Sequence, residues 1–493
     1  MRKFLIMVIM FVLLIPCLPS KAFALEKQIG PSLTKERLQS VDRYLDEAIS
    51  ELGAPGGSVA LVYKGKQVYT RSWGVTGGGK ETVTEETPFL IGSISKSVTA
   101  YGIMRLIDEG VLQADAPVQK YLPWFTLEDT EAASRITIRQ LLSQTSGLGN
   151  QAGMNIADRG ASDQLAIQRN AKELAGEQSE AFPGAKHIYS NANYALLGAV
   201  IEEVSGMTYA DYMESHIFTP LGMEHTAATV QKADALGWQP GYRSWLGLSI
   251  PSDNQYDNGG APYGYLAASS SDMARFLIAL QQPGTVVSAQ RTKEMMQPEI
   301  QVRPGSSYAL GWRITQTNTG EVRVWHAGST PDFRAEIVLL PASGWGIVML
   351  TNQNNRLEED RLSIVVRGLE DLLLTGETKP ISFPVIWERW LAIGVILVLM
   401  GYTSWIIAAL WRGQMTKCGK WTWGMTGCLF FLLAGLLIPG LLYTTKTSWH
   451  TFSLFAPDLK ELTMLAVILL TINGLFSLIK ASTVPVRLTT KKS

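Results

Sequence analysis

Ser93 and Lys96 are three positions apart and have side chains suited to nucleophilic catalysis. An apolar helical pattern starts at Val98 and runs to Ile107, so both residues share one face at the beginning of a helix. A serine hydroxyl is a weak nucleophile until a base accepts its proton, and a lysine amine can be that base when burial lowers its pKa. The positive end of the helix dipole also favours the uncharged amine. Ser93 is therefore a candidate nucleophile and Lys96 a candidate base.

Two later segments carry polar groups that such a site would need. Tyr189 and Asn191 are two residues apart on an expected extended turn, which would point both side chains to the same side. His326, Gly328 and Ser329 follow a run typical of a β-strand, and glycine there allows another backbone to approach closely. We therefore expect these segments to meet the Ser93 helix at one site.

In order and spacing, the three segments resemble the motifs of the serine β-lactamase and penicillin-binding protein superfamily. They look most like the branch that contains class C β-lactamases, D-alanyl-D-alanine carboxypeptidases and related esterases. The segments 141–148 and 194–223 are also similar to that branch, and the resemblance covers residues 33–374. The resemblance implies a hydrolase that works through an acyl-enzyme, without a cofactor.

The resemblance also implies a role for each candidate residue. Ser93 would be acylated, and Lys96 and Tyr189 would share the proton transfers, with the identity of the resting base left open. Asn191 would orient the substrate amide. The remaining residues would lie on a strand lining the site, where the backbone N–H of Ser93 and that of a second serine form the oxyanion hole: His326, Gly328 and Ser329.

His326 departs from the family pattern, because many relatives have lysine at this place. Lysine supplies a permanent charge for a substrate carboxylate, whereas histidine is mostly neutral at pH 7. Efficient β-lactamases resemble the lysine version, so His326 favours a peptidase or esterase over a β-lactamase. Arg334, close downstream, is a candidate for the missing cation.

The elements expected to position these residues come from both ends of one large segment. Strands are expected at 57–63, 67–73, 308–314, 322–326, 335–340 and 345–350, and helices at 34–52 and 358–374. The region 111–235 between them is mostly helical and loop-like. The pattern predicts an α+β, two-lobed, β-lactamase-like fold, in which an antiparallel sheet from both chain ends is flanked by helices and a helical lobe. A site is expected in the cleft between the lobes.

The two ends of the chain are apolar. Residues 1–24 have a basic start, an apolar stretch and a small-x-small sequence, and are expected to be a secretory signal peptide. Residues 25–380 would be the extracytoplasmic hydrolase domain. The region 387–480 is expected to hold three transmembrane helices, at about 390–411, 421–443 and 462–480. None of them carries an acid or base at membrane depth that would indicate transport, so they are expected to be anchors.

The charges beside these runs predict their orientation. Arg412, Lys417 and Lys420 lie between the first two runs, and the tail 481–493 is basic, so the positive-inside rule places both in the cytoplasm. Cysteine is absent from the exported segment, which favours a bacterial protein. We expect a multi-pass protein of the bacterial cell membrane with an extracytoplasmic catalytic domain and a cytoplasmic C-terminus.

Composition argues against two other classes of function. Lys+Arg and Asp+Glu both number 43, and no basic stripe of the kind that binds nucleic acid is present. The 5 histidines are scattered without a pair at helical spacing, so no metal site is expected.

The expected function is that of a membrane-anchored serine hydrolase acting on cell-wall D-alanyl peptides or D-alanyl esters. A β-lactamase is one alternative. A non-catalytic cell-wall sensor or scaffold with the same fold is another, although the complete Ser93, Lys96, Tyr189 and Asn191 set argues against it.

Overall fold

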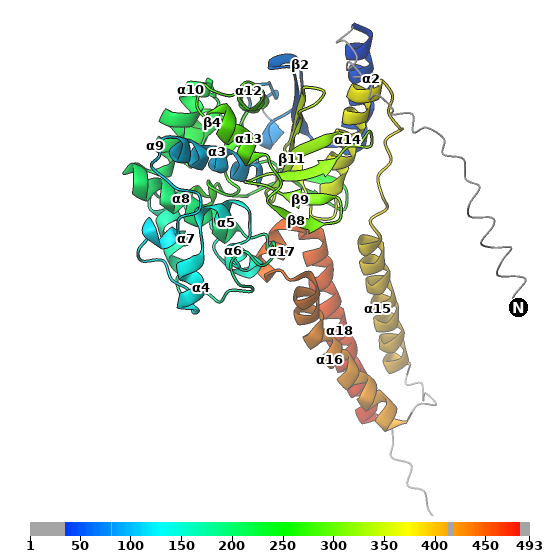
Figure 1. The fold of residues 1–493 in the computed structure, drawn as a ribbon. Helices are drawn as coiled ribbons and strands as arrows, with labels where there is room; N and C mark the ends of the chain where they lie inside the picture. Colours follow the sequence, from blue (N-terminus) through cyan, green and yellow to red (C-terminus); the bar gives the residue numbers. More distant parts are fainter. Residues whose placement is uncertain (1–34, 80, 413–418, 484–493) are drawn as a thin grey trace, which may run out of the picture.

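The computed structural model of the protein describes residues 35–79, 81–412 and 419–483. The expected signal peptide, residues 1–24, lies outside the described residues, and so does nearly all of the expected tail. The described chain forms a mixed domain of helices and strands, from which a group of long helices projects (Figure 1). The expected α+β fold is confirmed.

An eight-stranded antiparallel sheet is the centre of the domain, in the order β2-β1-β13-β12-β11-β10-β9-β8. Its strands come from both ends of the domain sequence, as expected: β1 (Gly56–Tyr63), β2 (Lys66–Gly74), β8 (Ile300–Arg303), β9 (Ser306–Tyr308), β10 (Arg313–Gln316), β11 (Val322–Ser329), β12 (Arg334–Leu340) and β13 (Trp345–Thr351). The two ends join where β1 pairs with β13, with Val59 opposite Met349. β11, which carries His326, lies inside the sheet and is positioned on both sides.

The expected single strand at 308–314 is wrong. The chain forms a hairpin there, in which Tyr308 of β9 pairs with Arg313 of β10. Gly311 has a φ of +84°, a left-handed conformation that glycine adopts without strain. Buried Leu310 and Trp312 give the turn an apolar sequence that resembles a strand.

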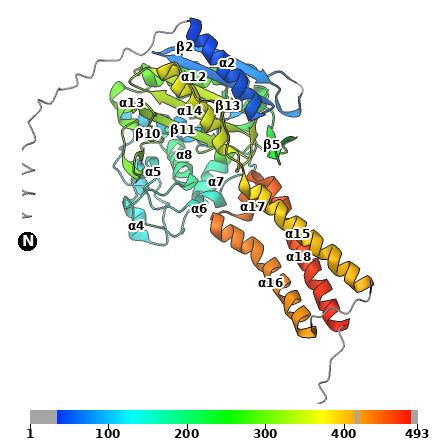
Figure 2. The same ribbon diagram turned by 90° about the vertical axis from the view of Figure 1, so that its right-hand side faces the viewer.

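Two terminal helices cover one face of the sheet (Figure 2), namely α2 (Lys35–Leu52) and α14 (Glu359–Thr375). Val41 and Leu45 of α2 and Val366 of α14 are buried in one apolar cluster with sheet residues such as Val59 and Ile347. The other face packs against α12 (Ser270–Gln281) and α3 (Ile94–Asp108), the helix that follows Ser93.

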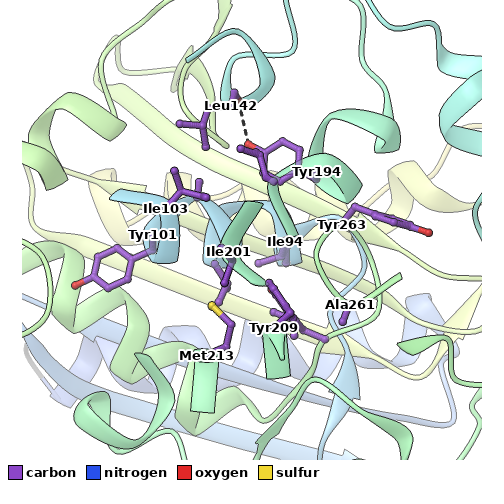
Figure 3. Close-up of a cluster of buried hydrophobic side chains, with 14 of the residues drawn as sticks. Ile94, Tyr101, Ile103, Leu142, Tyr194, Ile201, Tyr209, Met213, Ala261 and Tyr263 are labelled. Carbon is purple, nitrogen blue, oxygen red and sulfur yellow. Dashed lines mark hydrogen bonds between the residues drawn. The ribbon is translucent and has the colours of Figure 1, made fainter. Parts of the chain in front are cut away.

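The second lobe is helical and surrounds α8 (Asn191–Ser205), whose side chains from Ala192 to Ile201 are all buried. Figure 3 shows its Tyr194 and Ile201 in the buried cluster with Tyr101 of α3, and Tyr194 donates to Leu142 O at 2.9 Å. The other helices of this part are α4 (Thr130–Arg135), α5 (Ile138–Leu142), α6 (Asn150–Asn155), α7 (Ala166–Glu173), α9 (Tyr209–Met213), α10 (Thr219–Leu221), α11 (Val230–Ala235) and α13 (Ala289–Met295). Short strands complete the domain: β3 (Phe89–Leu90), β4 (Thr226–Ala227), β5 (Tyr242–Trp245), β6 (Leu248–Pro251), β7 (Ala267–Ala268) and β14 (Gln353–Asn354).

Within the described residues, three helices are long and apolar enough to cross a membrane: α15 (Trp387–Trp411), α16 (Lys420–Thr445) and α18 (Pro457–Thr483). The short α17 (Trp449–Phe455) connects the last two. Helix α18 packs against both α15 and α16. Its fully buried Asn473 donates to Leu399 O at 3.2 Å and accepts from the Thr403 hydroxyl at 2.7 Å, so a polar contact fixes α18 against α15.

A buried ion cluster joins the long helices to the domain. Arg389 of α15 contacts Asp458 of α18 at 2.5 Å and Glu358, which precedes α14, at 2.7 Å. Asp458 also accepts from the Asn355 amide at 3.0 Å. The side chains of Arg389, Asp458 and Glu358 have exposed fractions of 9%, 0% and 8%. The domain is therefore held on the helices by more than the connecting chain.

Candidate active site

Ser93 occupies the N-cap position of α3, but its side chain makes no capping hydrogen bond. The hydroxyl is instead 3.1 Å from Lys96 Nζ, one turn along the helix. A serine at this position usually accepts from the backbone of the first turn. Ser93 is therefore free for chemistry in a place where caps are common.

Lys96 is fully buried, and three oxygen atoms surround its amine. Nζ donates to Asn191 Oδ1 at 2.8 Å and to Tyr263 O at 2.6 Å, both of which only accept. Burial lowers the pKa of Lys96. In its uncharged form the amine has two hydrogens for these two acceptors, and its lone pair would then be directed to the Ser93 hydroxyl.

Tyr189 lies on the other side of the amine, with its ring centre 5.0 Å from Lys96 Nζ. Burial by itself raises the pKa of the Tyr189 hydroxyl, but the positive charges of Lys96 and Arg313 and hydrogen bonding with Ser93 outweigh it and lower that pKa. Tyr189 is thereby suited to exchange a proton with the Ser93 side of the site.

Gln144 holds the loop that carries Tyr189. Its side-chain Oε1 accepts from the Ser190 backbone at 2.9 Å, and its own carbonyl accepts from Ile188 N at 2.9 Å. Gln144 is fully buried and has a φ of +61°, which is uncommon for a residue with a side chain. The Ser190 hydroxyl accepts from Ala192 N and so begins α8, which places Asn191 at the first helical position.

Two glycines let β11 lie directly against the start of α3. A Cβ on Gly328 would be 1.8 Å from Ile91 O, and a Cβ on Gly92 would be 2.2 Å from Ser329 N. Gly92 also has a φ of +53°. The backbones on either side of Ser93 and Ser329 are thus in close contact, which is the arrangement that two oxyanion-binding N–H groups require.

His326 is neutral in this environment. Its Nδ1 donates to Ala327 O at 2.8 Å, and its Nε2 is 3.3 Å from the Tyr308 hydroxyl, which leaves Nε2 as an acceptor. Burial, together with the charges of Arg313 and Lys96, lowers the pKa of His326 well below its usual value. His326 therefore does not supply the positive charge that a lysine at this place would carry.

The structure places a different cation in the cleft, one that sequence reasoning missed. The Arg313 guanidinium lies 5.3 Å from the Tyr189 ring centre and 5.9 Å from that of Tyr308, and it faces the same hollow as Ser93. Arg334 donates to Gly328 O at 3.0 Å and to the Ser329 hydroxyl at 3.2 Å, and so supports β11. Arg313 follows the misread turn at Gly311, so no regular strand pattern indicated its direction.

Two further titratable residues near the site, Asp332 and His187, have structural contacts. Asp332 is fully buried and accepts from Gly241 N at 2.9 Å and from the Asn254 amide at 3.0 Å. His187 packs 5.1 Å from the Tyr308 ring, and burial lowers its pKa to about 4. In the described part of the chain, no group of three His, Cys, Asp or Glu side chains is gathered to hold a metal ion.

Of the residues selected from the sequence, six line one hollow of about 1340 Å³: Ser93, Tyr189, Asn191, His326, Ser329 and Arg334. Lys96 lies beneath its surface, and Gly328 forms the contact between β11 and α3. The hollow extends well beyond these residues and reaches the ends of the long helices.

Comparison with known proteins adds four findings. The family model described as Beta-lactamase matches residues 41–369. Protein flp of Staphylococcus aureus strain MW2 is 30% identical over 330 residues, which are 66% of this chain and 64% of that protein, so the match spans less than two thirds of that relative's length. Penicillin-binding protein 4 of Amycolatopsis lactamdurans is 26% identical over 321 residues, which are 62% of this chain and 83% of that protein. A solved structure, that of the octameric penicillin-binding protein homologue from Pyrococcus abyssi, superimposes with a TM-score of 0.62 at 26% identity and covers 73% of this chain and 81% of that one.

Proposed function

Because the chain belongs to the β-lactamase family of serine hydrolases, we propose that it is a membrane-anchored hydrolase that acts through an acyl-enzyme on Ser93. The observation that carries the proposal is the environment of Lys96: a fully buried amine with two carbonyl-type acceptors and the Ser93 hydroxyl within 3.1 Å.

The reaction would begin when the Ser93 hydroxyl gives its proton to Lys96 and its oxygen attacks the substrate carbonyl carbon. The N–H groups of Ser93 and Ser329 would bind the oxyanion that forms. The leaving group would depart with a proton supplied through Lys96 and Tyr189, which interact with one another across 5.0 Å from amine to ring centre. Water, activated by the same pair, would then release the acyl group and restore Ser93.

The proposed substrates are D-alanyl peptides or D-alanyl esters of the bacterial cell wall. A penicillin-binding protein among the relatives supports this class. Arg313 supports it as well, since a guanidinium beside the cleft is suited to a substrate carboxylate. Neutral His326 is consistent with a peptidase or esterase rather than a β-lactamase.

The proposed location is the bacterial cell membrane, with the domain outside the cell and the C-terminus in the cytoplasm. Arg412 and Lys480 lie at the ends of α15 and α18 that are remote from the domain, and Lys420 starts α16 at that same level. The positive-inside rule places such charges in the cytoplasm, which puts the domain on the other side.

The test is acylation of the full-length protein by a fluorescent penicillin, followed by peptide mapping. The label is expected on the peptide that contains Ser93 and is expected to be absent from Ser93→Ala and Lys96→Ala. Ser95→Ala is a matched control, because the Ser95 hydroxyl accepts from Leu266 N at 3.2 Å and does not face Lys96. Equal labelling of wild type and Ser93→Ala would contradict the proposal. If no lactam, ester or peptide acylates the protein, the non-catalytic sensor is the better interpretation.

A further inference from the structure

The hollow that holds Ser93 continues to the membrane helices. Its walls include Asn150 and Met154 of α6 and Phe452 and Phe455 of α17. Helix α6 lies beside α17 in both views (Figures 1 and 2). His450 Nε2 is 3.1 Å from Asp158 O just after α6, so this contact joins the helical lobe to the long helices.

Beyond α17 the hollow becomes an apolar groove between α15 and α16, with α18 as its floor. The residues that form the groove are Leu391, Ala392 and Val395 of α15, Leu437 and Leu441 of α16, and Leu462 and Ala466 of α18. On α15 they reach about 12 Å from the helix start at 1.5 Å per residue. That depth is roughly two fifths of a hydrocarbon core of about 30 Å.

The groove ends where α15 and α16 meet. Tyr402 and Phe430 have ring centres 5.1 Å apart, and Trp405 stacks on Trp423 at 5.8 Å. These contacts lie farther from the domain than Val395 and Leu437. The groove is therefore closed below and continuous above with the cleft of Ser93.

The polar part of the hollow carries more unpaired cations than acids. Among its lining residues, five cations form no ion pair with a carboxylate in the described chain, namely Arg303, Arg313, Arg334, Arg367 and Lys446, whereas Asp360 and Glu388 are the corresponding unpaired acids. Glu359 and Glu370, which also line it, are paired with Arg356 and Arg323. An anionic group is therefore favoured between the cleft and the groove.

We propose that the substrate is anchored in the membrane: its acyl group lies at Ser93, its anionic headgroup lies along these cations, and its hydrocarbon tail occupies the groove between α15 and α16. This inference rests on the proposed function and specifies its substrate as an acyl ester of an anionic lipid. A hydrocarbon tail matches the groove because its walls are apolar, it opens along helices of membrane-spanning length, and it leads to the nucleophile without a break.

The reaction on such a substrate balances without a co-reactant other than water. Ser93 Oγ bonds to the acyl carbon, and the bond from that carbon to the oxygen of the lipid breaks. The departing oxygen takes the proton that Ser93 lost, so the lipid leaves as an alcohol. Water then cleaves the acyl-enzyme and releases the acid.

The test uses the full-length protein in phosphatidylcholine vesicles and compares two substrates that have the same headgroup. One substrate is D-alanyl phosphatidylglycerol, which is carried in those vesicles. The other is the D-alanyl ester of glycerophosphoglycerol, which has no acyl chains. The quantity measured is the ratio of the two kcat/KM values, because the ratio cancels any general loss of activity. Val395→Trp is expected to fill the groove and lower the ratio about tenfold relative to wild type.

Matched controls are available on the same helices. Val398 is 72% exposed and does not line the groove, so Val398→Trp is expected to keep the wild-type ratio. On α16, Leu437→Trp is expected to lower the ratio and Leu436→Trp to keep it, since Leu437 lines the groove and Leu436 does not. This second pair keeps the test valid if one variant fails to fold.

The outcomes separate this inference from the proposed function. If both substrates are hydrolysed and neither Val395→Trp nor Leu437→Trp changes the ratio, the membrane-anchored substrate is overturned and the serine hydrolase stands. If wild type hydrolyses neither ester and no penicillin labels Ser93, the proposed function fails, and this inference fails with it.

Discussion

Burial of the Lys96 amine favours its uncharged form, which its proposed role as a base requires. Its hydrogens have acceptors in Asn191 and Tyr263, and its desolvation disfavours the ammonium form. Arg313 adds a second influence, because its positive charge also lowers the pKa of Lys96. The charge of one residue thereby adjusts the protonation of another.

Activity on a neutral ester is therefore expected to depend on pH through Lys96. The pKa of Lys96 is lowered, so the amine is uncharged above that pKa and gains a proton below it, and kcat/KM should fall about tenfold per pH unit on the acid side. Arg313→Gln removes a positive charge and raises this pKa, so the acid limb should move to higher pH. The measurement is a pH profile of kcat/KM. Arg169→Gln, at an exposed ion pair with Asp163, is expected to leave the limb in place, and an unmoved limb in Arg313→Gln would contradict the argument.

Arg313 should also recognise a substrate carboxylate. A hydrogen bond to a charged group contributes about 1.5–3 kcal/mol, which corresponds to roughly 10–100-fold in kcat/KM. Arg313→Gln is expected to lose that factor on a peptide with a free terminal carboxylate and to lose much less on the same peptide capped as an amide. Equal losses on both peptides would exclude a carboxylate contact.

At the scale of elements, the contact between β11 and the start of α3 would assemble the proposed oxyanion site. The contact depends on Gly328, because a methyl group there would lie 1.8 Å from Ile91 O, and the backbone has to move to accept it. The distance between β11 and the start of α3 is therefore set by two glycines, Gly328 on β11 and Gly92 just before α3.

Gly328→Ala is expected to slow acylation by penicillin strongly and to lower the free energy of unfolding by about 1–3 kcal/mol, the usual cost of overpacking. Labelling rate and thermal melting of the purified protein check both effects. Gly264→Ala is the control, since nothing lies within 4 Å of the Cβ that it would add. Wild-type labelling by Gly328→Ala would show that the close contact is not needed.

Particular elements explain what the sequence revealed and what it did not. The strands 57–63 and 345–350 have continuous apolar patterns, and the structure contains them as β1 and β13. Ser93 and Lys96 share a helix face, so their spacing alone indicated a pair. Tyr189 lies on a loop without a period, so only its motif pointed to it. The direction of the Arg313 side chain depends on the hairpin at Gly311, and a glycine within an apolar run did not indicate that the chain turns there.

The whole molecule has a buried ion cluster between domain and helices that the sequence also did not reveal. Arg389 and Asp458 lie 69 residues apart and next to apolar runs, where charges usually mark only the edge of the membrane. One Arg389 nitrogen, Nη2, has no partner among the described residues, so the cluster is buried without being fully satisfied.

Arg389→Gln should destabilise this junction strongly. Removal of Arg389 leaves Asp458 buried without an ion-pair partner, which costs about 3–5 kcal/mol. The expected result is a clearly lower melting temperature of the full-length protein in detergent. Arg356→Gln breaks an ion pair whose arginine is 67% exposed, and is expected to cost roughly 0–1 kcal/mol. Similar melting temperatures for the two variants would show that the cluster does not bear on stability.

The buried ion cluster of Arg389, Asp458 and Glu358 also limits how far the active-site cleft can move relative to the long helices. The chain between Thr375 and Trp387 would allow a loosely linked domain to swing, since extended backbone spans roughly 3.3–3.6 Å per residue. Arg389 removes that freedom by binding the domain to the top of the helices. With the proposed membrane location, the mouth of the cleft would stay at one height above the bilayer, and only substrate bonds at that height would reach Ser93. Outer layers of the envelope would remain out of reach, however abundant the same bond is there.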